Sequence, residues 1–309
     1  MKIKTIPILL LLLTIFISGC KQIEETSEII LYSSKAEAGQ NLRDESDSGQ
    51  IIRIALASVL SPQESLSKYK DLLAYIGTEM DASVEIIQKQ SYQEVNQMLK
   101  SGEVDIAFIC SLSYVLGLKG DYIVDVAAPV IDGEALYQSY TIVSQNSPYE
   151  SLEELEGKRF AYTDPYSYTG RLSILNQLYQ KGYSLTEFFR DTYFTYSHDY
   201  SVKAVELGIV DGATVDGVLF DQLQRTNPDL TSQIRVIGIG DEAGTPPIVA
   251  SKKADMKMVE EFKSLLFNLQ EHEKGKELLN EIGFDHYVPI NQKDYEVIQN
   301  ALFLLGESS

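Results

Sequence analysis

The chain has 309 residues, with 45 acidic against 26 basic side chains and a formal net charge of −19. Such a charge disfavours nucleic acid and an anionic membrane face as partners. The sequence contains no Walker loop, dinucleotide fingerprint, HExxH helix or CxxC pair, so we expect neither a cofactor nor a metal. An anionic ligand remains compatible with the charge, because carboxylates farther away than about 8 Å are screened at physiological salt.

The N-terminus predicts export. Residues 1–4 are Met-Lys-Ile-Lys, residues 6–17 form an apolar core, and the small residues Ser-Gly precede Cys20. The core is too short for a comfortable transmembrane helix. The ending resembles a bacterial lipobox, which implies that residues 1–19 are a signal peptide and that Cys20 carries a lipid; a plain secretory peptide with a chance cysteine is the alternative. We therefore expect an extracytoplasmic protein that is lipid-anchored to the bacterial cell membrane.

The mature chain divides into a tether and a two-lobed body. Residues 20–50 are mostly polar and acidic, which predicts a flexible tether. The remainder is long enough for two lobes, and we expect residues 51–138 and 241–309 to form lobe 1 and residues 139–240 to form lobe 2. Cys110 is the only cysteine besides Cys20, so no internal disulfide is expected, and it is predicted to be a buried apolar residue.

Short apolar strands and helices alternate along the body. In chain order we expect strands at residues 51–58, 83–87, 104–109, 122–127, 137–144, 158–162, 193–196, 213–215, 234–239 and 248–251, and the main helices at 62–76, 92–102, 172–182, 202–207, 218–223, 256–269, 274–282 and 294–305. This alternation predicts an α/β fold with two mostly parallel sheets, one in each lobe. Ligands bind outside the carboxyl ends of such strands, so we expect a ligand cleft between the lobes.

One junction has the composition of an anion receptor. The strand at residues 158–162 leads into a polar turn, and a helix follows. The first N–H groups of a helix are unpaired and carry a partial positive charge. Ser167 and Thr169 add hydroxyl donors, and Gly170 is expected to let a ligand approach the backbone, which together favour a tetrahedral oxyanion. The simpler alternative is that Ser167 or Thr169 only caps its own helix.

Several stretches of the body resemble the phosphonate, phosphite and phosphate-binding proteins of ABC importers, which have the two-lobed type II periplasmic-binding fold. The resemblance extends from about residue 51 to residue 298. It is carried by residues 91–95 (SYQEV), 99–108 (LKSGEVDIAF), 137–155, 157–172 around DPYSYTG, 197–199 (SHD) with 210–214 (VDGAT), and 282–289 (IGFDHYVP). It implies a monomeric binding protein and not an enzyme, with an ABC permease and ATPase as its partners.

The resemblance also implies a set of ligand-binding residues. These are Tyr92, Tyr137, Ser167, Tyr168, Thr169 and His198, with Asp216 close by. Ser167, Tyr168 and Thr169 are expected to grip the phosphorus oxygens through hydroxyls and backbone N–H groups. His198 would add a charged donor when protonated, so affinity is expected to rise as the pH falls toward about 6.5.

The expected ligand is a small one. Val218 and Pro246 stand where aminoalkylphosphonate binders have acidic residues for the amine. This difference favours phosphate, phosphite or a small alkylphosphonate. Tyr166 or Tyr168 is expected to line the site and to limit the group that phosphorus carries.

Two other functions fit parts of the sequence. Ser167 and His198 are residue types of a hydrolase nucleophile and base. No GxSxG elbow and no metal-ligand spacing accompanies them in the sequence, which disfavours a secreted hydrolase. A ligand-loaded two-lobed protein also suits docking on a membrane sensor kinase, and the sequence does not separate this use from import.

Overall fold

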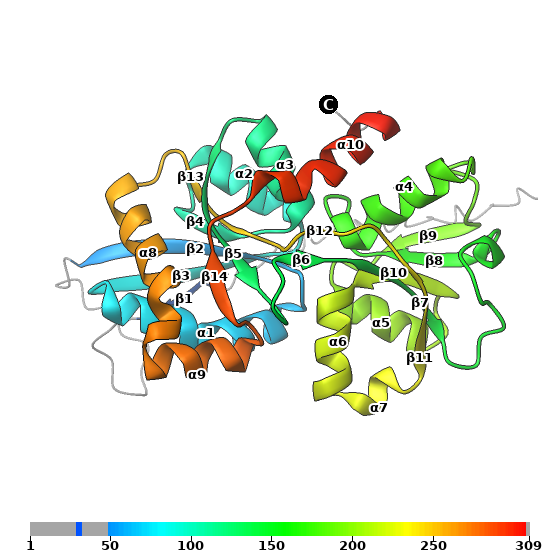
Figure 1. Ribbon diagram of the computed structural model, residues 1–309, viewed down its shortest axis with the longest axis horizontal. Coiled ribbons are helices and arrows are strands. Elements are labelled where there is room, and N and C mark those ends of the chain that lie inside the picture. The colour runs from blue at the N-terminus through cyan, green and yellow to red at the C-terminus, as the bar shows by residue number, and fades with distance from the viewer. Residues whose placement is uncertain (1–28, 33–48, 307–309) are drawn as a thin grey trace, which may run out of the picture.

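A computed structural model of the chain describes residues 29–32 and 49–306. The expected signal peptide, Cys20 and most of the expected tether lie outside the described residues. Within the described ranges, no helix has the length and apolar character needed to cross a bilayer. The described chain forms two lobes, each built on a central sheet (Figure 1).

The first lobe has a seven-stranded sheet in the order β1-β3-β2-β4-β13-β5-β14. Neighbouring residues of β2 face opposite ways, and both directions are buried: Ile54 packs toward α1 and α8, whereas Ala55 packs toward α2 and α3. A strand covered on both faces is mostly apolar, as β2 is apart from Gln50 and Arg53. The elements are β1 (Ile29–Tyr32), β2 (Gln50–Ala57), α1 (Pro62–Glu79), β3 (Ala82–Lys89), α2 (Tyr92–Ser101), β4 (Ile106–Phe108), α3 (Ser111–Lys119), β5 (Ile123–Val130), β13 (Ile248–Ser251), α8 (Met256–Asn268), the 3-10 turn η3 (Leu269–Glu271), α9 (Glu273–Ile282) and β14 (His286–Val288).

The second lobe has a five-stranded sheet in the order β11-β7-β10-β8-β9. Two apolar clusters fill its faces, one beneath α5 and α6 and the other beneath α4. The elements are β7 (Ser139–Ser144), the 3-10 turn η1 (Glu153–Leu155), β8 (Arg159–Tyr162), the turn η2 (Tyr168–Leu172), α4 (Ser173–Gln180), β9 (Asp191–Phe194), α5 (His198–Glu206), β10 (Gly212–Asp216), α6 (Gly217–Thr226), α7 (Pro228–Thr231) and β11 (Ile234–Ile239).

Two linkers join the lobes and pair with each other. The strand β6 (Leu136–Tyr137) leads into lobe 2, and β12 (Ala243–Gly244) leads back, with Tyr137 opposite Ala243. The C-terminal helix α10 (Glu296–Leu305), which follows the turn η4 (Gln292–Tyr295), packs on α3 of lobe 1 and on α4 of lobe 2 (Figure 1). The lobes are therefore joined covalently by two linkers and bridged by the packing of α10.

The sheets are mixed, so the expectation of mostly parallel sheets is wrong. Only the pairs of β2 with β3 and β4, and of β8 with β9 and β10, are parallel among the described strands. β7 and β13 run antiparallel to their neighbours. Both follow the linkers directly, and the chain enters each lobe against the direction of its parallel strands.

The expected tether also needs a correction. Residues 29–32, the one apolar stretch in it, form strand β1, which pairs antiparallel with β3 from Ile29 opposite Ile87 to Tyr32 opposite Val84. An edge strand exposes unpaired backbone groups that another strand can satisfy. This part of the expected tether is therefore an added strand of the lobe 1 sheet.

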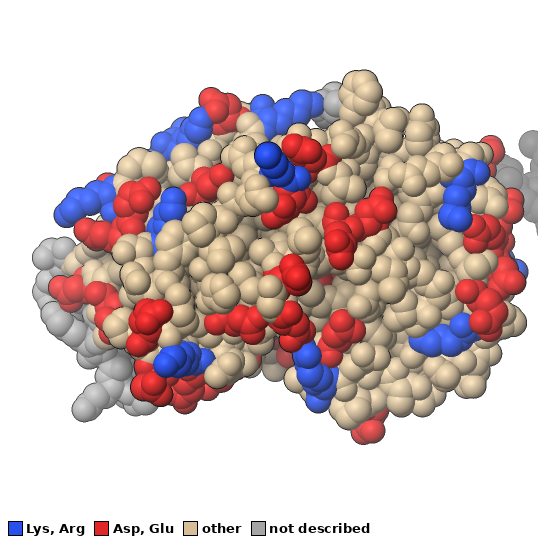
Figure 2. Space-filling view, in the orientation of Figure 1, with Lys and Arg blue, Asp and Glu red and all other residues tan. Residues whose placement is uncertain are grey.

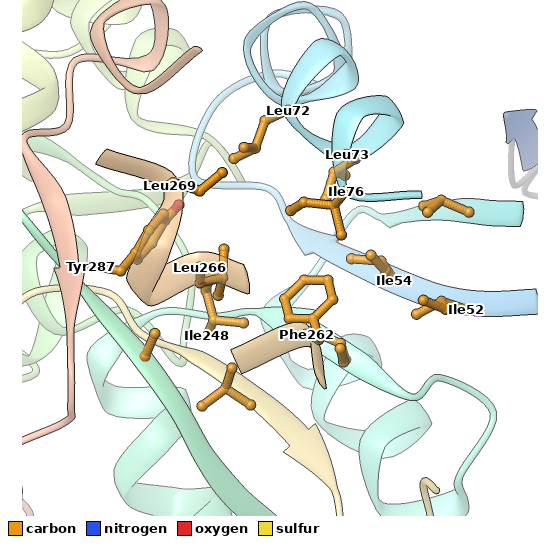
Figure 3. Packing of buried hydrophobic residues seen from close by; sticks show 14 of the residues in the cluster. Ile52, Ile54, Leu72, Leu73, Ile76, Ile248, Phe262, Leu266, Leu269 and Tyr287 are labelled. Carbon is orange, nitrogen blue, oxygen red and sulfur yellow. The ribbon is translucent and has the colours of Figure 1, made fainter. Parts of the chain in front are cut away.

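The core of lobe 1 lies between its sheet and the pair α1 and α8. Figure 3 shows Phe262 of α8 and Ile76 of α1 on the side of Ile54 of β2, and Leu266 of α8 beside Ile248 of β13. All five side chains are fully buried, and burying a side chain of this size stabilises the fold by about 1.5–3 kcal/mol. These contacts fix the position of α1, which carries a residue of the site described below.

Acidic side chains are scattered over both lobes on the face shown in Figure 2, among fewer basic ones. No basic patch covers the boundary between the lobes on that face.

Candidate ligand-binding site

The expected anion receptor is the junction between β8 and α4. Ser167 precedes one widened, π-helical turn, η2, in which the Leu172 N–H donates to the Ser167 carbonyl at 3.0 Å. Ser167 Oγ accepts the Gly170 N–H at 2.9 Å and so caps this turn. The simpler alternative from the sequence is thus present in the structure. A hydroxyl that accepts one bond still has a proton to donate, so capping does not remove Ser167 from the site.

Gly170 serves the packing of the protein itself. A Cβ at this position would lie 2.4 Å from Cβ of Thr163 and 2.8 Å from Oγ of Ser167. Real Cβ atoms do not come so close to other heavy atoms. The expectation that Gly170 opens the backbone to a ligand is wrong, because Thr163 occupies that space.

Tyr168 is held by its backbone and by its phenol. Its side chain is only 1% exposed, and its hydroxyl donates to the Asp241 carbonyl at 2.9 Å. Its N–H donates to Sγ of Cys110, across the lobe boundary, at 3.4 Å. The cavity described below is lined by Tyr137, and neither Tyr168 nor Tyr166 lines it. The expectation that one of those two tyrosines limits the group on phosphorus stays a prediction.

Five hydroxyls are buried without a hydrogen-bond partner in the described ranges, those of Tyr92, Ser113, Tyr137, Thr169 and Tyr287. Three of them belong to residues that the sequence predicts for the site: Tyr92 at the start of α2, Tyr137 on the linker strand β6, and Thr169 in η2. Leaving a buried hydroxyl unpaired costs about 1–3 kcal/mol. Three such groups need a common explanation, and a ligand that accepts their protons provides one.

Cys110 lies near Tyr92, Tyr137 and the start of η2. Burial raises the pKa of Tyr92 and Tyr137 well above the ordinary value, and the nearby Cys110 and Asp216 raise it further. The ring of Tyr137 lies 6.1 Å from that of Tyr168, whose N–H reaches Cys110. Tyr92, Tyr137 and the start of η2 therefore all lie near Cys110 at the boundary between the lobes. Both phenols remain protonated at neutral pH.

His198 is a neutral, fully buried residue. Its Nδ1 accepts the backbone N–H of Asp216 at 3.0 Å and lies 3.2 Å from Oγ1 of Thr163. The ring proton is therefore on Nε2. Burial lowers the pKa of His198 to about 3, so the expectation of a protonated histidine near pH 6.5 is wrong. His198 has one neutral donor, Nε2–H, to offer.

A cavity of about 80 Å³ opens beside Tyr137 and Asp216. Asp216 caps α6, since Oδ1 accepts the Leu219 N–H at 3.0 Å, and burial raises its pKa to about 6 while Lys68 lowers it. Val218 and Pro246 also line this cavity. The two apolar residues that stand where the aminoalkylphosphonate binders have acids thus line the same cavity as Tyr137 and Asp216.

Backbone and side-chain bonds hold the two lobes together around the site. The Tyr92 N–H donates to Oδ2 of Asp164 at 3.1 Å, and the Ser61 N–H donates to Oδ1 of Asp199 at 2.9 Å. The His198 N–H donates to a carbonyl of lobe 1 at 3.0 Å. Each of these bonds crosses from one lobe to the other. The structure therefore has its lobes closed on one another.

The family model for the periplasmic substrate-binding protein of phosphonate ABC transporters matches residues 54–295. The chain belongs to this family. It is 24% identical over 225 residues to the phosphate-import protein PhnD of Mycolicibacterium smegmatis, with 69% of this chain and 70% of that protein covered. It is 24% identical over 251 residues to a probable ABC transporter phosphite-binding protein, PhnD1 of Prochlorococcus marinus, with 77% of this chain and 84% of that protein covered.

The fold of this phosphonate-binding family member is shared with solved structures. PhnD1 from Prochlorococcus marinus in complex with methylphosphonate matches with a TM-score of 0.76 at 19% identity, covering 83% of this chain and 98% of that one. The two-lobed type II periplasmic-binding fold expected from the sequence is confirmed. Periplasmic binding proteins of ABC transporters work outside the cytoplasm, which agrees with the predicted export.

Some residues of the site in this family member were not predicted. Asp164 and Asp199 bind the other lobe, although both lie in the polar turns that the sequence singled out. Carboxylates in those turns, next to residues with site roles, are a signal for contacts between the lobes. Lys68 has no such signal, because it lies in the middle of α1 and reaches the cavity only in the folded chain.

Proposed function

We propose that this protein captures a phosphorus oxyanion, namely phosphate, phosphite or an alkylphosphonate, between its lobes for delivery to an ABC permease and ATPase. The observation that carries the proposal is the set of buried, unpaired hydroxyls of Tyr92, Tyr137 and Thr169 in the part of the chain that the structure describes. The Tyr92 hydroxyl comes from lobe 1, the Thr169 hydroxyl from lobe 2 and the Tyr137 hydroxyl from the linker strand β6. Only closed lobes bring them together.

The donors suit an anion that is recognised without a basic residue. Tyr92, Tyr137 and Thr169 supply hydroxyls, Ser167 supplies a fourth, and His198 supplies a neutral N–H. Each hydrogen bond to a charged oxygen contributes about 1.5–3 kcal/mol. Four or five amount to roughly 10 kcal/mol, reduced by the costs of association and ordering. The remainder is compatible with micromolar binding, which requires about 8 kcal/mol.

The names of similar proteins support the ligand class. One is called a phosphate-import protein, a second a phosphite-binding protein, and the solved PhnD1 contains methylphosphonate. All three ligands present tetrahedral phosphorus with at least two oxygens. We assign the same class here, and we assign no catalytic role to Ser167 or His198.

Calorimetry with phosphate, phosphite and methylphosphonate tests the proposal. Tyr137→Phe removes one of the unpaired hydroxyls and keeps the ring, so we expect at least one of the three ligands to bind the native protein and to bind the variant about tenfold more weakly. Tyr200→Phe, at an exposed position of lobe 2, is the matched control and should leave affinity unchanged. Equal affinity of Tyr137→Phe and native protein would place the ligand elsewhere.

The membrane anchor is a separate part of the proposal. Lipid on Cys20 would hold the lobes near the permease without any membrane-spanning segment in the mature body. Cys20→Ala in the native host should release the protein from the membrane fraction, and unchanged membrane association would exclude this anchor. Genes for a permease and an ATPase beside this one would favour import over docking on a sensor kinase.

A further inference from the structure

The cavity beside the oxyanion position is larger than an inorganic ion requires. It measures about 80 Å³, and one water needs about 10–15 Å³ by this measure. It is lined by Tyr137 and Asp216 and also by Lys68 and Tyr287, and its walls come from both lobes. Most of its walls are apolar: Val59, Leu60, Phe108, Ile131, Val218 and Pro246. Such walls suit a short organic chain attached to phosphorus.

One part of the cavity wall, around Lys68, is rich in hydrogen-bond donors. Lys68 of α1 donates to Oε1 of Gln222 of α6 at 2.7 Å, and its ammonium lies 5.4 Å from the centre of the Phe284 ring. Tyr287 is 3% exposed, and its hydroxyl is buried without a partner among the described residues. The Nε2 donor of Gln222 is likewise buried and unpaired within the described part of the chain.

The one carboxylate near the Lys68 ammonium, that of Asp216, forms no ion pair with it among the described residues, although each group shifts the pKa of the other. The Lys68 ammonium has three N–H donors and Gln222 accepts from one of them. Asp216 is the one acidic residue among those lining the cavity in residues 29–32 and 49–306, and its Oδ1 already accepts the Leu219 N–H. Burial lowers the pKa of Lys68 to about 8, so the amine remains mostly charged at neutral pH.

We propose that the cavity receives the substituent of an organophosphonate or phosphate ester, and that this substituent ends in a carboxylate bound by Lys68 and Tyr287. The inference rests on the proposed function and specifies the ligand of the same site. The η2 turn and the unpaired hydroxyls hold the phosphorus end, the apolar walls hold the carbon chain, and Lys68 pairs with the tail. An amine tail would meet the ammonium of Lys68 and be repelled.

Calorimetry at pH 7 with four probes tests this: methylphosphonate, phosphonoacetate, 3-phosphonopropionate and 2-aminoethylphosphonate. We expect one or both carboxylates to bind at least about tenfold more tightly than methylphosphonate, as one bond between charged groups provides, and the amine to bind no more tightly than methylphosphonate. Lys68→Met should reduce the ratio of carboxylate to methylphosphonate affinity to about one. Using the ratio removes any general effect of losing the contact between Lys68 and Gln222.

Two further variants make the result specific. Lys70 lies on the same helix as Lys68 but does not line the cavity, so Lys70→Met should keep the native ratio of carboxylate to methylphosphonate affinity. Tyr287→Phe should lower the ratio without removing a charge. Carboxylates that bind no better than methylphosphonate, or an amine that binds better, would overturn the carboxylate assignment while leaving the proposed function intact. Failure of all four probes to bind would overturn this inference, and failure of phosphate and phosphite as well would overturn the proposed function.

Discussion

The backbone N–H of Asp216 donates a hydrogen bond of 3.0 Å to Nδ1 of His198. This bond places the ring proton on Nε2 and ties α5 to the end of β10. Because burial also lowers the pKa of His198 to about 3, the residue is a neutral part of the site and of the lobe 2 core.

The neutral histidine predicts a specific pH dependence of stability. The unfolded chain takes up a proton on His198 below about pH 6.5, whereas the folded chain does so only near pH 3, so the free energy of unfolding falls as the pH drops between these values. The limiting slope is about 1.4 kcal/mol per pH unit. Urea unfolding of native protein and His198→Asn at several pH values should show a difference that grows with pH. Parallel pH profiles for the two proteins would contradict a buried neutral histidine.

The titration of Asp216 changes the stability in the opposite direction, so its contribution must be separated from that of His198. Burial raises its pKa from 3.8 to about 6, so the folded chain holds the proton more tightly and stability falls as the pH rises through that window. The histidine variant retains Asp216, and the difference between the two proteins therefore removes most of its contribution.

Thr169→Val should separate binding from stability. The substitution keeps the shape of the side chain and removes a buried hydroxyl that has no partner within the described ranges. We expect about tenfold weaker methylphosphonate binding, together with an unfolding temperature that is unchanged or higher in the absence of ligand. Ser167→Ala is the contrasting variant, because it also removes the cap of η2 and should cost about 1 kcal/mol of stability. A loss of stability in Thr169→Val would show that its hydroxyl is paired within the protein.

Gly170→Ala tests the packing of the β8 to α4 junction. The added methyl group would overlap Cβ and Oγ1 of Thr163, and overpacking of this kind destabilises by about 1–3 kcal/mol. Gly238→Ala is the control, since its Cβ would have its nearest neighbour at an ordinary 3.6 Å. Chemical denaturation of both variants gives the comparison. Equal stability of Gly170→Ala and native protein would show that packing does not require a glycine here, and would favour the original expectation that Gly170 lets a ligand approach the backbone.

Asp199→Ala should weaken closure. The change removes the acceptor for the Ser61 N–H, which crosses between the lobes at 2.9 Å. We expect methylphosphonate affinity to fall about three- to tenfold, mainly through faster dissociation, and small-angle scattering to show a more extended molecule. Asp229→Ala, an exposed position of α7, should change neither quantity. Unaltered affinity and dimensions in Asp199→Ala would mean that this bond does not hold the lobes together.

Local patterns predicted the elements well. The apolar runs at residues 234–239 and 248–251 coincide with β11 and β13, because polar, glycine or proline residues bound them on each side. The capping serine before α2 and the left-handed Gly102 after it also mark that helix in the sequence. Features that depend on neighbouring residues in the chain could therefore be predicted from the sequence.

Features that depend on residues far apart in the chain could not be predicted from the sequence. Strand direction in β7 and β13 follows from the linkers, and the need for Gly170 follows from Thr163 across the turn. The charge state of His198 depends on its burial, which the turn sequence does not reveal. Lys68 and Gln222 are 154 residues apart, and only folding places both in one cavity.

The C-terminal helix α10 has a mechanical consequence. Because it rests on α3 of one lobe and α4 of the other, any opening movement must shear or lift it from one of these supports. Phe303 on its outer surface is 79% exposed, so a fluorescent probe attached there would report the hinge motion directly. A protein fused to the C-terminus would hinder the movement of α10. Because α10 bridges the two lobes, we expect such a fusion to open more slowly and to exchange its ligand more slowly.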